Sequence, residues 1–326
     1  MQRTLPNAYI ELTLNTVNID KKGFQWRSNF VFSLNRNKVC SLDTETSLID
    51  KTIQSGSTTT IITRTAVGQP IGQFYGYKVI GRFEKASDFY YKNSEGKVVP
   101  VALPEGMSIG KNSVWIGDYI FEDINGDGVI NEQDRTYIGN PNPKFTYGIG
   151  NSFSYKGFDL NVYLSGSYGN DVVNWMRTAL ENPRENTNLL KSALDYAKLE
   201  LIDPNGPDDY RNIRIVGGDP YMPRMANSSA SNASNYRFSD RFVEDGSYLR
   251  IQSISLGYTF PRKWISKMKL QNLRLYCNLQ NVYTFTKYKG YDPEIGSDNQ
   301  DALLTGFDNY RYPSPRIYTF GLNVTF

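Results

Sequence analysis

One short stretch of this chain has the residue types and spacing of a metal-binding loop. Oxygen-bearing side chains recur at alternate positions from Asp123 onward, and Gly128 stands sixth. Calcium loops of the EF-hand kind use this pattern: the glycine permits a sharp turn, the seventh residue offers its carbonyl, and the twelfth closes the coordination shell. We therefore predict one structural calcium ion, with ligands from Asp123, Asn125, Asp127, the Val129 carbonyl, Asn131 and Asp134.

The loop departs from the pattern at its last position. Asp134 replaces the usual Glu there, so the final carboxylate is one methylene shorter. No pair of helices is predicted around the loop, so the site would be isolated and structural. Magnesium suits such a flexible, oxygen-rich ligand set less well than calcium. An Asp- and Asn-rich turn without any metal is the alternative interpretation.

The absence of histidine limits the other chemistry of the chain. It excludes Ser-His-Asp and Cys-His catalysis, His-ligated zinc and a histidine pH switch. Asp292 and Glu294 could form a glycosidase pair, but any chain rich in loops offers such pairs. Trp115, Trp175 and Tyr221 could stack on sugars, although loop aromatics more often pack against their own loop. We expect no enzyme.

The composition favours a protein that crosses a membrane with strands. Aromatic residues make up 14% of the chain, yet the mean hydropathy is −0.50. The sequence has no apolar run of about 18 residues, which excludes a spanning helix. Alternating strands of a β-barrel halve the mean hydropathy of each span and so fit both observations. A net charge of +3 without a basic run gives no reason to expect nucleic acid as a partner.

Seven segments alternate apolar and polar side chains with a period of two, which predicts strands with one apolar face. In the last of them the apolar positions are Tyr318, Phe320, Leu322, Val324 and Phe326. The opposite faces are rich in Gly, Ser, Thr and Asn, which suit the wall of a wet lumen. The predicted strands cover residues 9–18, 23–35, 145–155, 158–165, 248–260, 269–286 and 317–326. We expect their apolar faces to point outward, with Trp26, Tyr155, Tyr258 and Phe326 near the membrane rims.

Short and long connections alternate between these segments. The long ones cover about 36–143, 169–246 and 287–316. Outer-membrane barrels place tight turns in the periplasm and long loops outside, so we assign the long connections to the extracellular side. Residues 186–201 have a helical pattern, and the composition of 227–234 is typical of disorder. Seven strands are too few to close around such loops, and the first residues do not form an export signal. We expect a portion of a longer chain.

Four stretches in a fixed order carry a family resemblance: residues 68–77, 117–148, 245–261 and 281–294. They resemble the C-terminal part of the SusC/RagA-like TonB-linked outer-membrane transporters, and the resemblance extends over nearly the whole chain. It implies that residues 1–326 are about seven strands of an all-β, antiparallel transmembrane barrel of 22 strands. The plug domain, the TonB box and the early strands would lie outside this sequence, and with them the energy-coupling residues.

The resemblance also implies a function. Such a transporter imports oligosaccharides or peptides across the outer membrane with energy from the TonB complex, and a SusD-like surface lipoprotein acts as its lid. This chain would supply lipid-facing barrel wall and extracellular loops, with partner contacts on residues 68–77 and 169–246. The alternative is a stand-alone outer-membrane glycan-binding protein or adhesin without transport. A hydrolase is a third interpretation, weakened by the missing histidine. Nothing in the sequence names the substrate.

Overall fold

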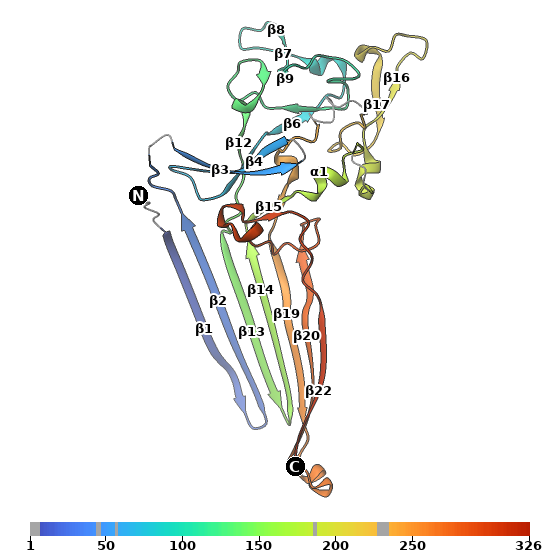
Figure 1. Ribbon diagram of the computed structural model, residues 1–326. Helices are drawn as coiled ribbons and strands as arrows, with labels where there is room; N and C mark the ends of the chain where they lie inside the picture. The colour runs from blue at the N-terminus through green and yellow to red at the C-terminus, as the bar shows by residue number, and fades with distance from the viewer. Residues whose placement is uncertain (1–6, 44–46, 56–57, 185–187, 227–234) are drawn as a thin grey trace.

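The computed structural model describes residues 7–43, 47–55, 58–184, 188–226 and 235–326 (Figure 1). A seven-stranded antiparallel sheet forms one end of the molecule, in the order β1-β2-β13-β14-β19-β20-β22. The predicted seven neighbouring strands are therefore confirmed. Their bounds are β1 Asn7–Lys21, β2 Phe24–Asn37, β13 Phe145–Tyr155, β14 Phe158–Tyr168, β19 Tyr248–Thr259, β20 Asn272–Thr286 and β22 Ile317–Thr325.

Three connections join these strands at the end away from the other elements, which we call the hairpin end. Lys22 and Gly23 turn β1 into β2, and Lys156 and Gly157 turn β13 into β14. Lys156 and Gly157 both have positive φ, 45° and 91°, as a tight hairpin turn that matches the strand twist requires. The third connection is longer and contains α3 (Arg262–Ile265) and η6 (Ser266–Met268).

The apolar face of the sheet is open. Phe320 is 77% exposed and Leu322 56%, and the neighbouring Leu275 and Leu256 are about half exposed. The three hydrophobic clusters of the described residues contain no member of this sheet. On the polar face a ring covers a glycine: a Cβ on Gly321 would lie 2.1 Å from Cζ of Tyr276. The face predicted to meet lipid therefore does not pack against a second sheet in the described structure.

The four aromatic residues assigned to the membrane rims gather at the hairpin end. Trp26 stacks on Phe153, with ring centroids 5.7 Å apart. Tyr155 pairs with Phe24, and Tyr258 with Phe158. Phe326 follows β22, whose Thr325 pairs with the first residue of β20. The structure thus assigns all four to one rim; their contact with a membrane surface stays a prediction.

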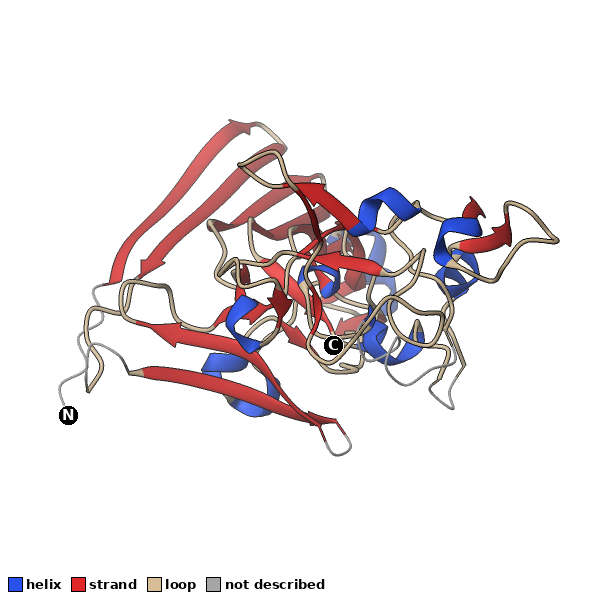
Figure 2. Ribbon diagram, turned by 90° about the horizontal axis from the view of Figure 1, so that it is seen from above, coloured by secondary structure: helices blue, strands red, loops and turns tan. Residues whose placement is uncertain are grey.

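The long connections after β2, β14 and β20 fold together into what we call the loop body (Figure 1). Figure 2 shows it from above, with short helices among its strands. Its largest core draws residues from all three connections: Ile62, Phe74, Val173, Phe238, Phe242, Leu304 and Phe307. The same mixing occurs in a small sheet, where β15 (Asp171–Asn174) pairs with β18 (Val243–Asp245) and with β21 (Phe307–Asp308). The loop body is therefore one packed unit.

Short elements make up the rest of the loop body. A four-stranded sheet has the order β12-β5-β4-β3, and the remaining strands pair as β10-β6, β11-β9, β7-β8 and β16-β17. The strands are β3 Leu48–Ser55, β4 Thr58–Ala66, β5 Gln73–Gly76, β6 Val79–Arg82, β7 Tyr90–Lys92, β8 Val98–Pro100, β9 Leu103–Pro104, β10 Tyr119–Phe121, β11 Val129–Ile130, β12 Thr136–Gly139, β16 Lys198–Leu201 and β17 Ile213–Gly217. The helices are α1 Met176–Leu180, η1 Ala86–Phe89, η2 Glu132–Asp134, η3 Lys191–Asp195, η4 Tyr210–Asn212, η5 Asp240–Phe242, η7 Asp298–Gln300 and η8 Ala302–Leu304.

The helix predicted over residues 186–201 is wrong. The described part of this range contains the 3₁₀ helix η3 and then the strand β16. In β16 the side chains of Leu199 and Leu201 alternate with polar ones and pack against a buried aromatic cluster, while β17 supplies the antiparallel partner. Tertiary pairing thus overrides the local helical pattern. The stretch 227–234, predicted to be disordered, lies outside the described residues.

Among the residues that the structure describes, no helix is both long enough and apolar enough to cross a membrane.

Candidate functional site

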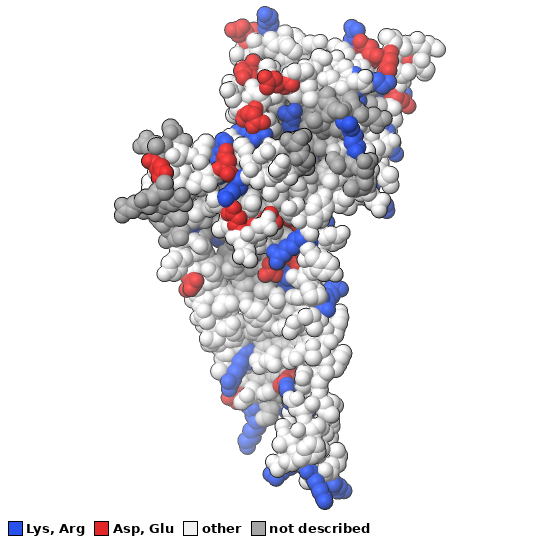
Figure 3. All heavy atoms as spheres, viewed as in Figure 1, with Lys and Arg blue, Asp and Glu red and all other residues white. Residues whose placement is uncertain are grey.

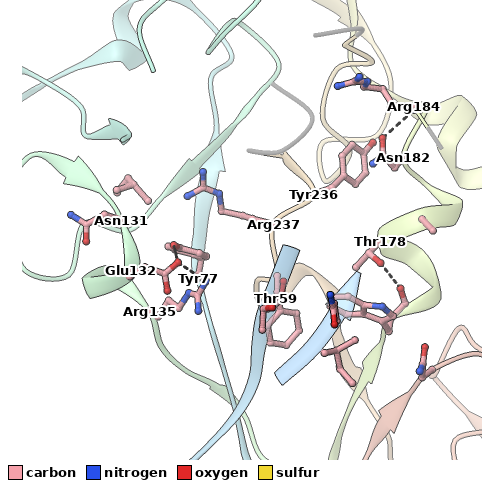
Figure 4. Close-up of a pocket in the computed structure, with 18 of the residues that line it drawn as sticks. Thr59, Tyr77, Asn131, Glu132, Arg135, Thr178, Asn182, Arg184, Tyr236 and Arg237 are labelled. Atoms are coloured by element: carbon pink, nitrogen blue, oxygen red, sulfur yellow. Dashed lines mark hydrogen bonds and ion pairs between the residues drawn. The ribbon is translucent and has the colours of Figure 1, made fainter. Parts of the chain in front are cut away.

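A cleft with a volume of about 920 Å³ lies in the loop body. All three long connections line it, and Figure 4 shows the polar side chains that point toward it. On one wall Glu132 accepts a hydrogen bond from Arg135 at 2.7 Å, and the Tyr77 hydroxyl lies 3.4 Å from the same carboxylate. The labelled side chains are Thr59, Tyr77, Asn131, Glu132, Arg135, Thr178, Asn182, Arg184, Tyr236 and Arg237.

Arg237 is the most unusual charge in this cleft. Its guanidinium carbon lies 4.8 Å from the ring centroid of Tyr77 and 5.0 Å from that of Phe121. Its buried Nε has no hydrogen-bond partner, and the side chain forms no ion pair with the described residues. Burial lowers the pKa of the Arg237 guanidinium and raises the pKa of the Tyr77 hydroxyl, the latter against the nearby charge of Arg135. The cleft therefore contains a partly desolvated cation that lies over two aromatic rings, while the charge of Glu132 also favours its ionised form.

Buried ion pairs hold the walls of the cleft. Glu181 accepts hydrogen bonds from Arg177 at 2.9 Å and from Arg241 at 2.5 Å, with only 2% of its side chain exposed. The Tyr236 hydroxyl donates to the Glu181 carbonyl at 2.8 Å, and burial raises the pKa of Tyr236 to about 12. This network fixes the wall to which Tyr236 belongs.

A second buried pair joins two of the connections. The Asp118 carboxylate accepts hydrogen bonds from Arg224 at 2.8 and 3.0 Å and from the Asn235 amide at 2.8 Å. Burial raises the pKa of Asp118, and Arg224 opposes that shift. Asn235 also accepts from the Tyr119 N–H at 3.1 Å. The polar interior of the loop body is thus built by hydrogen-bonded charges from distant parts of the chain.

Asp292 and Glu294 do not form a free carboxylate pair. Arg250, on β19, binds both: Nη1 donates to Glu294 at 2.6 Å, and Nη2 contacts Asp292. Burial acts against ionisation of Asp292, but the N–H of Glu294 and the charge of Arg250 hold its pKa below the usual range. Arg250 pairs in register with Ser165 and Thr284, on the polar face. The two carboxylates therefore anchor the third connection to the sheet, which argues against a glycosidase role.

The predicted calcium loop folds as a compact turn in the first connection. The Asp123 carboxylate accepts hydrogen bonds from the N–H groups of Gly126 at 2.8 Å and Gly128 at 2.9 Å. The fully buried Asp134 carboxylate accepts from Ile124 at 2.9 Å and Asn131 at 2.8 Å. The loop's own backbone thus satisfies the first and last predicted ligands.

The predicted ligands in the middle of the loop also accept hydrogen bonds from within the loop. Asp127 accepts from the Val129 N–H and from the Asn125 amide, both at 2.9 Å, and the amide contact is the main cause of a lowered Asp127 pKa. Asn131 accepts from the Gln133 N–H at 2.8 Å. Across the described residues, no three Asp, Glu or Cys side chains converge as they would around a metal ion. The oxygen-rich donor set is present without that convergence, so calcium stays a prediction.

The loop aromatics mostly pack within the loop body. Trp115 is 5% exposed in the cluster around Phe83, and Trp175 packs at tilted angles against Phe238 and Phe307 while also lining the cleft. Tyr221 is 83% exposed and remains available to a ligand or partner. The alternative interpretation, internal packing, therefore holds for the two tryptophans.

Residues 68–77 do not form the exposed aromatic surface expected of a docking segment. Phe74 is fully buried in the shared core and Tyr77 is 6% exposed, because β5 lies between β12 and β4. The expectation of partner contact on this segment is therefore wrong for its buried aromatic side chains. The second connection keeps exposed apolar residues, notably Tyr221 and Leu194.

Sequence reasoning missed the cleft itself. Its lining comes from residues as distant as Ile53 and Tyr310, and no local pattern predicts that they meet. The available signal was the run Tyr236-Arg237-Phe238, where a cationic residue stands between two aromatic ones after a stretch of small polar residues. Such a run favours cation–π contacts but does not indicate what they enclose.

Comparison with known proteins gives consistent matches along nearly the whole chain. The chain is 32% identical to the TonB-dependent receptor P3 of Formosa agariphila and 24% identical to the TonB-dependent receptor SusC of Bacteroides thetaiotaomicron, each over 99% of its length. It spans 29% and 26% of those proteins. It also superposes on 30% of a chain from the structure of the RagAB peptide transporter, with a TM-score of 0.65 and 18% identity, which shows a shared fold. No protein-family model matches the sequence.

Proposed function

Because the chain is a segment of a SusC/RagA-like TonB-dependent receptor of the outer membrane, we propose that its parent protein imports an oligosaccharide or a peptide. In this proposal the chain supplies barrel wall and extracellular loops, and transport rather than catalysis is its role. The supporting observation is the division of the molecule: the sheet leaves its apolar face open, while all three long connections form one body at the opposite end from the hairpins.

The open edges of the sheet support a larger barrel. β1 and β22 each have only one strand neighbour among the described residues. Unpaired backbone groups are costly in lipid, so a membrane sheet must close on itself. We propose that further strands of the parent chain, 22 in all by the family resemblance, pair with these edges. The energy-coupling contact with the TonB complex would lie in that remaining part.

The loop body is the proposed meeting place of cargo and a SusD-like lipoprotein. The cleft offers aromatic and cationic groups, and Arg237 forms no ion pair with any carboxylate of the described residues. The second connection exposes Tyr221 at 83% and Leu194 at 63%. Protein interfaces favour exposed aromatic and apolar anchors of this kind. A lid that binds there would place cargo beside the cleft.

Point substitutions test this better than deletion of residues 169–246. That deletion would also remove Val173, Phe238 and Phe242 from the core and so unfold the loop body. In the full-length receptor we expect Leu194→Asp with Tyr221→Asp to abolish co-purification of the lipoprotein and uptake of cargo, while the barrel stays in the membrane. The paired control is Tyr291→Asp with Tyr312→Asp, exposed 71% and 85% on the third connection.

The outcomes separate the candidate functions. Loss of partner and uptake only in the second-connection variant supports the proposed lid surface. Retention of both would show that the partner binds elsewhere. Surface binding of glycan without TonB-dependent accumulation in the periplasm would favour the stand-alone binding protein or adhesin.

A further inference from the structure

Cations outnumber acidic residues at the hairpin end, whereas charges of both signs are mixed over the loop body. Figure 3 shows the cations of the hairpin end at the lower tip of the molecule. Two acidic residues lie in this region, and one of them, Asp159, is already bound by Arg274 at 2.6 Å. The remaining cations, which we call the basic collar, form no ion pair with any described residue: Lys21, Lys22, Lys156, Arg262, Lys263, Lys267 and Lys269.

In the loop body, several cations form ion pairs with neighbouring carboxylates. There, Arg177, Arg224 and Arg241 are buried and bound by carboxylates. Even at its surface, Lys78 and Lys111 have acidic partners at 2.8 and 2.5 Å. At the hairpin end, by contrast, cations outnumber acidic residues, and the excess leaves an uncompensated positive field there.

Apolar side chains accompany the basic collar. In the connection between β19 and β20, Ile265 is buried and fixes the short helical turn, whereas Trp264 and Met268 are 61% and 60% exposed. Lys263 and Lys267 lie beside them in sequence. Exposed Trp with flanking Lys and Arg is the pattern of a segment that sits at a membrane–water interface.

The position of this connection agrees with such an interface. It follows Tyr258 and Phe260, whose ring centroids lie 4.9 Å apart. The ring centroid of Tyr258 also lies 4.3 Å from that of Phe158. These aromatics end the exposed apolar face of the sheet. The basic collar therefore begins where the lipid-facing band ends, at the level where phosphate groups would lie.

We propose that the basic collar binds the phosphates of anionic phospholipids in the periplasmic leaflet, with Trp264 and Met268 inserted among the upper acyl chains. The inference rests on the proposed function, because that function sets the orientation of the barrel. Charge complementarity and continuity with the apolar band select this occupant. An acidic protein would match the charge alone and would give no reason for Trp264 and Met268 to be exposed beside the lipid-facing strands.

Fluorescence of the full-length receptor in phosphatidylcholine vesicles tests the proposal. Two vesicle preparations are compared: one contains brominated phosphatidylglycerol, and the other contains the same fraction of brominated phosphatidylcholine. The fluorescence of Trp264 is obtained as the difference between the wild type and Trp264→Phe. We expect the anionic lipid to quench this signal about twofold more strongly, because cations near the surface enrich it locally. The preference should decrease with added salt, which screens the attraction.

Charge variants give the matched comparison. Replacement of Arg262, Lys263, Lys267 and Lys269 by Gln should remove the preference for phosphatidylglycerol. The control replaces Lys92, Lys97, Lys191 and Lys198 by Gln, four exposed lysines of the loop body, and should retain it. Equal quenching of the wild type by the two lipids would overturn the proposal and leave the collar to an acidic protein. No quenching by either lipid would instead show that the hairpin end does not lie at the membrane, which would contradict the proposed function itself. The two failures therefore give different results.

Discussion

The sheet exposes large apolar side chains, whereas the loop body buries side chains of the same types. In the sheet, large apolar side chains such as Phe320 stay exposed. In the loop body, Phe74 and Phe242 are fully buried in a core that three connections share. Exposed apolar rows are costly in water but not in hydrocarbon, whereas the loop body must bury its own. The same residue type is therefore exposed in one region and buried in the other, as we expect if lipid surrounds the sheet and water surrounds the loop body.

A substitution that opens a cavity in the core of the loop body should reduce its stability more than any other change considered. Phe242→Ala should destabilise it by about 4 kcal/mol, because Phe242 is fully buried beside residues of all three connections. Denaturant titration of the full-length receptor, followed by proteolysis of the loops, measures this. Phe320→Ala is the control on the sheet, and we expect a much smaller loss there. Similar losses at the two sites would show that Phe320 is packed against something in the assembled barrel.

Arg250 links the sheet to the third connection. Arg250→Gln should cost about 3 kcal/mol locally, because it leaves the buried Asp292 carboxylate without its cation. Hydrogen exchange in residues 287–316 should rise while the strands stay protected. Lys51→Gln is the matched control, since its partner Asp301 is more exposed.

The same link predicts a pH dependence with a defined sign. The folded pKa of Asp292 is lowered, so its contribution to stability is present above the ordinary carboxyl pKa and is lost as pH falls through the folded value. Exchange in residues 287–316 should therefore increase on acidification below about pH 4 in the wild type. The Arg250→Gln variant should show less change. An acid response of equal size in both would assign the effect to other carboxylates.

The two faces of β22 should differ in how well they tolerate a charge. Leu322→Arg on the apolar face should destabilise the inserted barrel by about 2–3 kcal/mol, since a charge near the middle of the bilayer is costly. Thr319→Arg, on the opposite face of β22, should cost about 1 kcal/mol or less. Folding into vesicles measures both. Equal costs would mean that the polar face is not in contact with water.

The two regions also differ in how far the sequence predicts them. The sequence predicts the strands closely, and β13 matches residue for residue, because a period-two pattern is local and can be read from each strand alone. The loop body has no such pattern. Its core joins Ile62 to Val173 and Phe307, and β16 occupies part of a predicted helix. Arg237 entered no prediction, since its aromatic partners Tyr77 and Phe121 come from another connection.

Calcium binding at the turn around Asp127 should stabilise the loop body only slightly. If calcium binds with the millimolar affinity common in extracellular sites, physiological calcium should stabilise the loop body by about 1 kcal/mol. Calorimetry of the full-length receptor with calcium or with a chelator would show a higher transition temperature with calcium. Asp127→Ala should remove that difference.

A matched variant separates the metal from the turn. Asp203→Ala removes a carboxylate that accepts the Asn205 N–H at 3.0 Å in a turn without the calcium spacing. It should lower stability slightly and leave the calcium response intact. If calcium changes nothing in the wild type, the hydrogen bonds to Asp123 and Asp134 are sufficient to hold the loop. The shared core and the buried ion pairs alone would then stabilise the loop body, whereas the sheet leaves its apolar face exposed.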